Sequence, residues 1–246
     1  MKYLIFLLFN VVQLYALVSI SPVEIGDNPG FSGIVNGAFD TKRGNTDSDN
    51  YTAGMKLSYD DNQSYLMWGE LNFTYGEANN VKNANKTYSH IRYIRKLEKS
   101  LDGEAFVQSQ SNEFTKVDER FLTGAGIRIH LDKENYGDLY FGFGMFYEYI
   151  NYSTDIDERE NHVRTNIYLA YKKEFTKDSQ LSYVAYYQPK FGDISDYIIT
   201  NALELKILIY EKLYISFTVS YNKDSKPAID VKKIDFSQRT AFIYKF

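Results

Sequence analysis

The sequence contains no cysteine, and after its first segment it contains no long hydrophobic run. The absence of cysteine excludes disulfides and thiolate metal sites, which is compatible with an exported protein that does not rely on bridges. No later segment offers the roughly 20 apolar residues that a transmembrane helix needs. An excess of basic residues is missing as well, because 28 Lys and Arg stand against 32 Asp and Glu, a net charge of -4. This balance argues against a nucleic-acid partner.

The one apolar run lies at the start of the chain. Residues 3–17 are apolar apart from Asn10 and Gln13, and they follow the positive charge of Lys2. Small residues that offer cleavage points come next: Ala16, Ser19 and Ser21. A membrane anchor is the alternative, but the run is shorter than the roughly 20 residues of a spanning helix. We therefore predict a signal peptide over residues 1–21, cleaved between 16 and 21, followed by a periplasmic N-terminal segment, 22–30.

Aromatic residues are abundant, with 23 Tyr and 17 Phe, although the mean hydropathy is only -0.41. Apolar residues must therefore alternate with polar ones, which is typical of strands. The clearest alternation lies in residues 65–75, where one face carries Tyr65, Met67, Gly69, Leu71, Phe73 and Tyr75. Similar alternation recurs in residues 51–59, 139–149, 181–187 and 213–221.

The pattern predicts about twelve strands, an even number as in bacterial outer-membrane barrels. We expect them near residues 31–39, 50–60, 64–76, 87–97, 102–112, 119–131, 137–150, 161–175, 180–191, 197–209, 213–222 and 235–246. Short connections alternate with longer, more polar ones, as periplasmic turns alternate with outer loops. The prediction is an all-β fold, an antiparallel transmembrane β-barrel over residues 31–246, with both termini facing the periplasm.

A soluble β-sandwich is the alternative, since its strands also alternate. Three features argue against it. Aromatic residues mark both ends of the apolar faces, as Tyr51 and Tyr59 do, where interfacial girdles of a membrane barrel would lie. The strands exceed the roughly five or six residues of soluble sheets. The chain also stops inside a strand with an apolar face, and we expect Phe242, Tyr244 and Phe246 to form a C-terminal signal for the barrel-assembly machinery.

The opposite faces of the strands carry charges of both signs, which would point into the lumen. Because unpaired charges away from water are costly, these side chains should pair or contact lumen water. The predicted network comprises Glu70, Arg92, Glu104, Arg120, Arg128, Glu148, Arg164, Glu204, Lys206 and Arg239, with Lys56 beside them. A barrel of about twelve strands lies between filled barrels of about eight and open pores of sixteen or more, so the sequence leaves an open or a plugged lumen possible.

Four inward glycines on two neighbouring strands predict a hollow in the wall: Gly124, Gly126, Gly142 and Gly144. Our hypothesis is that a large side chain from the opposite wall fills it. Glycines that ease barrel curvature are an equally good interpretation.

Candidates for chemistry are few. His90, His130 and His162 share no obvious site, and Ser89 beside His90 should point to the other face of its strand. Three scattered histidines without cysteine offer no metal-ligand spacing. We predict no catalytic, cofactor or metal site, and no enzyme. Basic residues of the first two loops could contact lipopolysaccharide phosphates: Lys42, Arg43, Lys82 and Lys86.

Several short motifs, spread over nearly all of the mature chain, are similar to those of a known protein family. They are residues 44–46 (Gly-Asn-Thr), 103–105 (Gly-Glu-Ala), 112–114 (Asn-Glu-Phe), 119–120 (Glu-Arg), 124–128 (Gly-Ala-Gly-Ile-Arg), 187–189 (Tyr-Gln-Pro), 226–227 (Lys-Pro) and 231–235 (Val-Lys-Lys-Ile-Asp). Together they resemble the YdiY-like family of salt-induced outer-membrane proteins, which carries a domain of unknown function. The resemblance implies an outer-membrane barrel without an assigned reaction, and the family's name hints at salt or osmotic stress.

Three functions follow as hypotheses. The first is a non-enzymatic barrel that contributes to the envelope under osmotic stress, and the second is a narrow pore for ions or small polar solutes. The third and weakest is an enzyme of envelope lipids. We expect a monomer in the outer membrane of a Gram-negative cell, with outer-membrane lipids and lipopolysaccharide around it.

Overall fold

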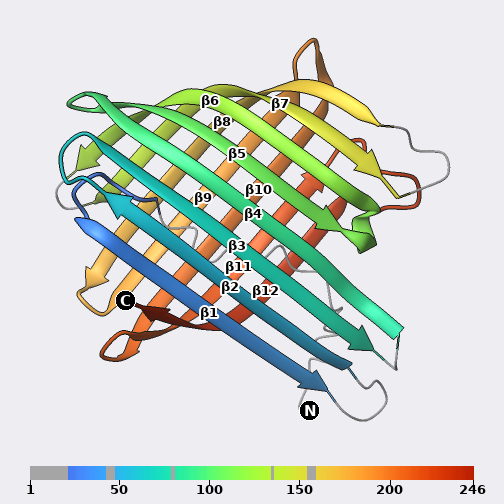
Figure 1. The fold of residues 1–246 in the computed structure, drawn as a ribbon, viewed down its shortest axis with the longest axis horizontal. Coiled ribbons are helices and arrows are strands. Elements are labelled where there is room, and N and C mark those ends of the chain that lie inside the picture. The colour runs from blue at the N-terminus through green and yellow to red at the C-terminus, as the bar shows by residue number, and fades with distance from the viewer. Residues whose placement is uncertain (1–21, 43–47, 79–80, 134–135, 154–158) are drawn as a thin grey trace, which may run out of the picture.

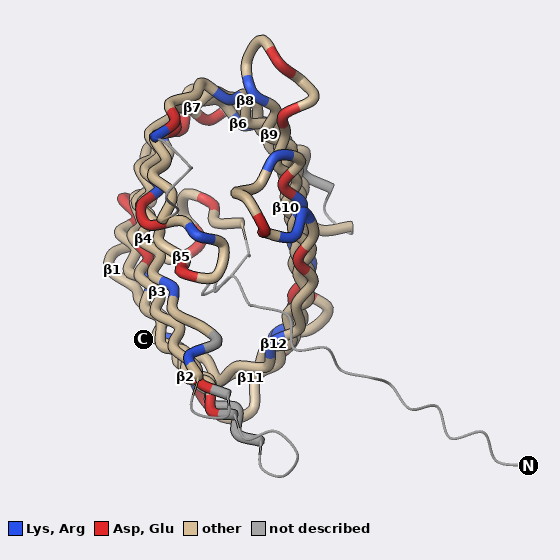
Figure 2. The backbone as a smooth tube through the Cα atoms, turned by 90° about the vertical axis from the view of Figure 1, so that its right-hand side faces the viewer, with Lys and Arg blue, Asp and Glu red and all other residues tan. Residues whose placement is uncertain are grey.

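The computed structural model describes residues 22–42, 48–78, 81–133, 136–153 and 159–246. Within these residues, twelve strands form a closed antiparallel barrel (Figure 1), in which each strand pairs with its neighbours in sequence and the first pairs with the last. In Figure 2, which is turned by 90° about the vertical axis from Figure 1, their backbones form a closed oval ring. The strands are β1 (Gly30–Lys42), β2 (Ser48–Asp60), β3 (Tyr65–Ala78), β4 (Val81–Glu98), β5 (Leu101–Asn112), β6 (Val117–Lys133), β7 (Gly137–Tyr152), β8 (Glu160–Thr176), β9 (Ser179–Lys190), β10 (Asp193–Tyr210), β11 (Leu213–Asp224) and β12 (Ile234–Lys245). The predicted fold class is confirmed.

The strand bounds follow the predicted ranges, with two larger differences. Strand β4 begins at Val81 instead of residue 87, and β10 begins at Asp193 instead of residue 197. Both extensions are polar, and they pair with the neighbouring strand across a register shift, as Lys82 does with Glu77. Apolar alternation marks only the part of a strand that faces lipid, whereas backbone pairing continues beyond it. The only helix among the described residues is the single 3-10 turn η1 (Glu113–Thr115), and none is long and apolar enough to cross a membrane.

Strand β7 shows how the alternation separates the two faces. Phe141, Phe143 and Met145 are exposed on the outer surface, while Phe146 and Glu148, which point to the opposite face of the same strand, are buried in the interior. An exposed band of large apolar side chains is what a lipid-facing surface requires. The interior therefore holds the polar residues, including all ten of the predicted network.

The two ends of the barrel differ. One end, here called the turn end, carries the short β2–β3, β4–β5, β6–β7, β8–β9 and β10–β11 connections. Strand β1 begins at this end and β12 ends there. The opposite end, here called the loop end, carries the remaining connections, including the long one between Asp224 and Ile234.

The seam between β1 and β12 closes the ring. It has only four paired positions, from Ile34 with Lys245 to Gly37 with Phe242, whereas β1 and β2 pair over thirteen. Phe246 extends the seam, because its N–H donates to the Gly33 carbonyl and its own carbonyl accepts from the Gly33 N–H, both at 2.9 Å. Its ring lies where a side chain on Gly33 would be, since a Cβ there would be 2.3 Å from the ring. Gly33 and Phe246 thus fit each other on the outer face.

Candidate functional site

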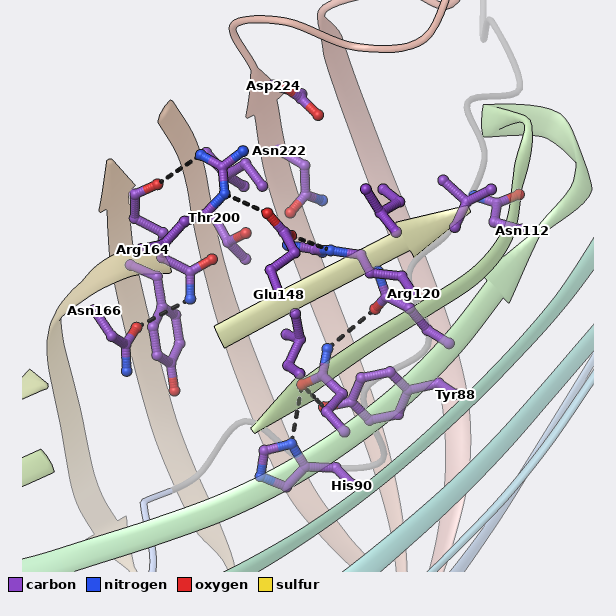
Figure 3. Close-up of a pocket in the computed structure, with 18 of the residues that line it drawn as sticks. Tyr88, His90, Asn112, Arg120, Glu148, Arg164, Asn166, Thr200, Asn222 and Asp224 are labelled. Carbon is purple, nitrogen blue, oxygen red and sulfur yellow. Dashed lines mark hydrogen bonds and ion pairs between the residues drawn. The ribbon is translucent and has the colours of Figure 1, made fainter. Parts of the chain in front are cut away.

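The barrel encloses a cavity of about 450 Å³, which is the candidate site (Figure 3). Its lining extends from Lys226 and Lys232 at the loop end, past Trp68 and Arg128, to Pro22 and Val23 at the turn end. The ten charged side chains of the predicted network fall into three groups in the structure.

The first group surrounds Glu148 of β7, which is 2% exposed. Its Oε1 accepts a hydrogen bond from Arg120 Nε at 2.6 Å, and its Oε2 accepts one from Arg164 Nε at 2.5 Å. Arg164 Nη1 also lies 2.9 Å from an oxygen of Asp196. Figure 3 shows Arg120 and Arg164 approaching Glu148 from two sides. The buried carboxylate is therefore fully paired, as burial of a charge requires.

The second group surrounds Glu104 of β5. Tyr168 donates its hydroxyl to Glu104 Oε2 at 2.6 Å, and Arg92 and Arg128 each lie 3.8 Å from Oε1. Arg128 Nε also donates to Asp102 at 2.8 Å. Tyr168 comes from β8, so its ring crosses two intervening strands to reach the carboxylate.

The glycine hollow makes this crossing possible. Gly142 pairs directly with Tyr168 across β7 and β8, and a Cβ on Gly142 would lie 2.0 Å from the Tyr168 ring. Phe146 and Phe106, from β7 and β5, similarly cover Gly124. The expectation of a filling side chain from the opposite wall was wrong, because adjacent strands already place large rings over the missing side chains. Gly126 and Gly144 are paired, and a Cβ on either would lie within 2.6 Å of the other strand's backbone.

Replacing Gly142 with alanine should therefore displace the Tyr168 ring and weaken its hydrogen bond to Glu104. We expect the free energy of unfolding to fall by about 1–3 kcal/mol, the usual cost of overpacking an interior. The measurement is urea unfolding of the barrel refolded into lipid vesicles, in which the loss appears as a lower midpoint. Gly69→Ala is the matched control, because its Cβ would meet nothing closer than Ile91, at an ordinary 3.7 Å. Equal midpoints for the two variants would contradict this role of Gly142.

The third group lies on the walls nearer the seam. Glu70, Glu204, Lys206 and Arg239 are each 7% exposed or less. Arg239 and Lys56 are electrostatic neighbours of both Glu70 and Glu204. Alternation along the strands predicted that all of these side chains face the lumen. Alternation alone could not show that the charges form separate groups.

An aromatic stack lies beside Arg92 of the second group and Lys56 of the third. The Trp68 and His90 rings are stacked with centroids 4.8 Å apart, and Phe106 follows at 5.7 Å from His90. Lys56 Nζ lies 4.2 Å from the Trp68 ring on a cation–π contact. His90 Nδ1 hydrogen-bonds Gln108 at 3.0 Å, while Ser89 on the other face donates to a backbone carbonyl. Ser89 and His90 therefore do not form a nucleophile–base pair.

Residues 22–29, here called the N-terminal segment, cross the turn end of the barrel. The N–H groups of Gly26 and Asn28 donate to Asp60 of β2 at 2.8 and 3.4 Å. At the opposite wall, Arg128 donates to the Val23 carbonyl at 2.8 Å, and Lys172 of β8 binds Asp27 at 2.9 Å. The sequence predicted only that this stretch lies in the periplasm, because no motif or periodicity in it indicates what it contacts.

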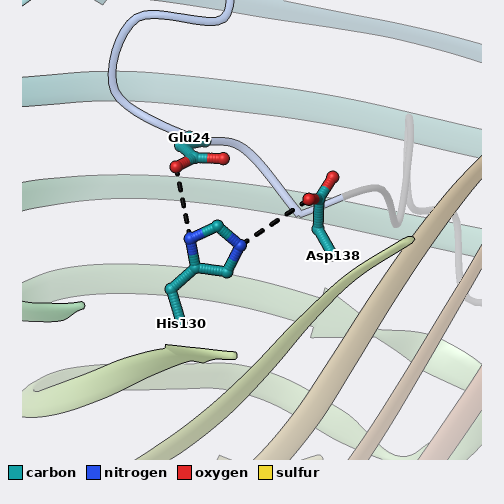
Figure 4. A group of neighbouring side chains, drawn as sticks. All are labelled: Glu24, His130 and Asp138. Atoms are coloured by element: carbon teal, nitrogen blue, oxygen red, sulfur yellow. Dashed lines mark ion pairs between the residues drawn. The ribbon is translucent and has the colours of Figure 1, made fainter. Parts of the chain in front are cut away.

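Glu24 carries a further contact of this segment (Figure 4). His130 Nδ1 lies 3.3 Å from Glu24, and His130 Nε2 lies 3.6 Å from Asp138 on its other side. The three side chains could bring ligand atoms within 4.8 Å of one another. Tyr140 already donates to Glu24 at 3.1 Å, however, and Lys172 Nζ lies 3.4 Å from Asp138. The arrangement is therefore suited to fastening the segment to β6 and β7.

Residues 225–233, here called the crossing loop, cover part of the loop end. Lys116, from the opposite side of the ring, donates to the Ile229 carbonyl at 2.8 Å and lies 3.6 Å from Asp230. At the other end of the loop, Lys226 donates to Asp193 at 2.8 Å, and this hydrogen bond raises the pKa of Lys226. Both ends of the lumen are thus crossed by chain.

The lysines predicted at lipopolysaccharide phosphates lie apart. Lys82 is exposed and pairs with Glu113 at 3.0 Å. The hydrogen bonds from Asn85 and Lys82 lower the pKa of Glu113. Lys86 lines the cavity instead of facing outward, because it lies an even number of residues from inward-facing His90. Arg43 lies outside the described residues.

Comparison with known proteins agrees with the fold. The family described as protein of unknown function DUF481 matches residues 35–246, and no curated protein matches the chain. Among solved structures, the NanC porin has a TM-score of 0.51 at 14% identity, covering 87% of this chain and 97% of that chain. The KdgM porin in complex with disordered oligogalacturonate has a TM-score of 0.49 at 12% identity, covering 88% and 99%. The translocator domain of autotransporter NalP from Neisseria meningitidis reaches 0.49 at 13% identity, covering 89% and 90%.

Proposed function

The chain belongs to the DUF481 family of proteins of unknown function, and we propose that it forms a narrow outer-membrane channel for small anionic solutes. This proposal rests on one observation, the charge of the cavity lining. Eleven basic and six acidic side chains line the cavity, an excess of five basic side chains, in a chain whose net charge is -4. The basic residues are Lys56, Lys86, Arg92, Arg120, Arg128, Arg164, Lys190, Lys223, Lys226, Lys232 and Lys233, and the acidic ones are Glu70, Glu148, Glu160, Asp196, Asp224 and Asp235.

A lumen that carries one sign of charge concentrates ions of the opposite sign and selects among them. The charged and hydrogen-bonding side chains of the lining, together with the cavity volume, suit a small solute with hydrogen-bonding groups, such as a small organic acid or an inorganic anion. The proposed role is non-enzymatic, and unchanged lipid composition after overexpression would agree with it.

The cellular setting is part of the proposal. Export through the predicted signal peptide would deliver the chain to the periplasm, and the barrel-assembly machinery would insert it into the outer membrane as a monomer among lipids and lipopolysaccharide. Phe242, Tyr244 and Phe246 are 46–56% exposed on the outer face of the last strand, where such machinery could read them.

A second candidate is a structural barrel that does not conduct and strengthens the envelope under osmotic stress. The crossing of both ends by chain and the close pairing around Glu148 and Glu104 favour it. The two candidates differ in one measurable property, which is conduction.

We expect the barrel, refolded into planar bilayers, to conduct small ions with a preference for chloride over potassium. Lys86→Gln should lower that preference, because it removes a positive charge from the lining. Lys82→Gln is the matched control on the same strand, since Lys82 pairs with Glu113 outside the cavity. A correctly folded barrel that shows no conductance steps would overturn the channel and support the structural role.

A further inference from the structure

We propose that the turn end of the barrel is a docking site for the chain's own N-terminal segment, and that undocking of this segment opens the lumen. The effect on conduction rests on the proposed function, whereas docking can be measured without it. The segment is continuous with β1, and the site lies partly on the far wall.

The contacts show that the segment reaches from wall to wall. It leaves β1 next to Asp60 of β2, and its other contacts are with Arg128, Tyr140 and Lys172 on β6, β7 and β8. In a closed ring of twelve strands, β7 and β8 lie opposite β1 and β2. The segment therefore extends across the opening and does not lie along one side of it.

The inner end of the segment forms one boundary of the cavity. Pro22 and Val23 belong to the lining, together with Arg128 and Tyr140. Removing the segment would take away this boundary and join the cavity to the turn end, so the segment is placed to control passage.

The docking is held mainly by hydrogen bonds and ion pairs. Every residue from 22 to 29 is half-buried or exposed, in contrast to the buried inward side chains of the strands. Its charged contacts, Asp27 with Lys172 and Glu24 with His130, involve carboxylates whose side chains are 35–36% exposed. Partly exposed ion pairs contribute little individually, and segments with little buried apolar surface open first. These features suit a reversible occupant.

Charge reversal tests the docking directly. The natural chain has no cysteine, so a Val23→Cys variant gives a single thiol whose labelling rate reports exposure of the segment. Lys172→Asp places a third carboxylate beside Asp27 and Asp138, and it should raise the labelling rate severalfold and increase conductance. Adding Asp27→Lys should restore both values. Lys177→Asp, on the exposed neighbouring turn, should change neither.

The outcomes separate the two proposals. Fast labelling in the Val23→Cys background alone, or no rescue by the double reversal, would overturn docking. Labelling that responds as expected, with conductance unchanged by Lys172→Asp and by deletion of residues 22–29, would overturn the gate. If no variant conducts while labelling still responds, docking stands and the channel function fails.

Discussion

Deletion of Phe246 is expected to prevent most of the protein molecules from assembling in the outer membrane, while their secretion stays unchanged. The deletion removes two backbone hydrogen bonds from a seam that has only four other paired positions. Inside a membrane each unsatisfied backbone group costs several kcal/mol, so a shortened seam leaves an open edge that lipid cannot satisfy. The folded fraction can be measured by the heat-dependent mobility of the barrel on denaturing gels.

The fit between Phe246 and Gly33 provides an independent route to the same effect. A side chain on Gly33 would occupy the space of the Phe246 ring, so Gly33→Val should also reduce the assembled fraction. Gly69→Ala, a lipid-facing glycine with room for a methyl group, should assemble normally. Full assembly of both the deletion and Gly33→Val would show that the seam closes without the aromatic residue.

The second large effect is expected for Glu148. Glu148→Leu would leave Arg120 and Arg164 without the carboxylate that pairs them, and both guanidinium groups are nearly buried. Removing one partner of a buried ion pair typically costs about 3–5 kcal/mol, because the remaining charge is uncompensated. The free energy of unfolding by urea in lipid vesicles should fall by about this amount.

An exposed carboxylate serves as the control for that experiment. Glu113 pairs with Lys82 at the surface, where both side chains are exposed by 41–49%, so Glu113→Gln should not measurably change stability. A Glu148→Leu barrel as stable as the natural one would mean that water screens the arginines, and the lumen would then be more hydrated than the cluster indicates.

The sequence predicted the fold because membrane barrels repeat one simple rule. Alternation in stretches such as residues 65–75 fixes which side chains face lipid, and the inward positions of Glu104, Arg128 and Glu148 follow from it. The strand ends were less predictable, since polar extensions such as residues 81–86 pair without an alternating pattern.

The arrangement within the lumen depends on register around the ring, which alternation does not encode. Gly142 and Tyr168 are 26 positions apart in the chain, yet they are direct partners across β7 and β8. Alternation along single strands therefore could not predict that the Tyr168 ring fills the glycine hollow. The crossing of both ends is equally invisible, because the N-terminal segment and the crossing loop have no periodic pattern and make their contacts through single polar side chains.

The proposed function and the proposed docking together make the lumen a passage lined by an excess of basic side chains, which the N-terminal segment closes. The most direct test is the reversal potential of the barrel lacking residues 22–29 in a planar bilayer with a KCl gradient. We expect a stable conductance that is larger than the conductance of the chain that retains the segment, with a reversal potential of the sign of chloride selectivity. A cation-selective reversal potential, or a folded barrel that does not conduct in either form, would contradict it.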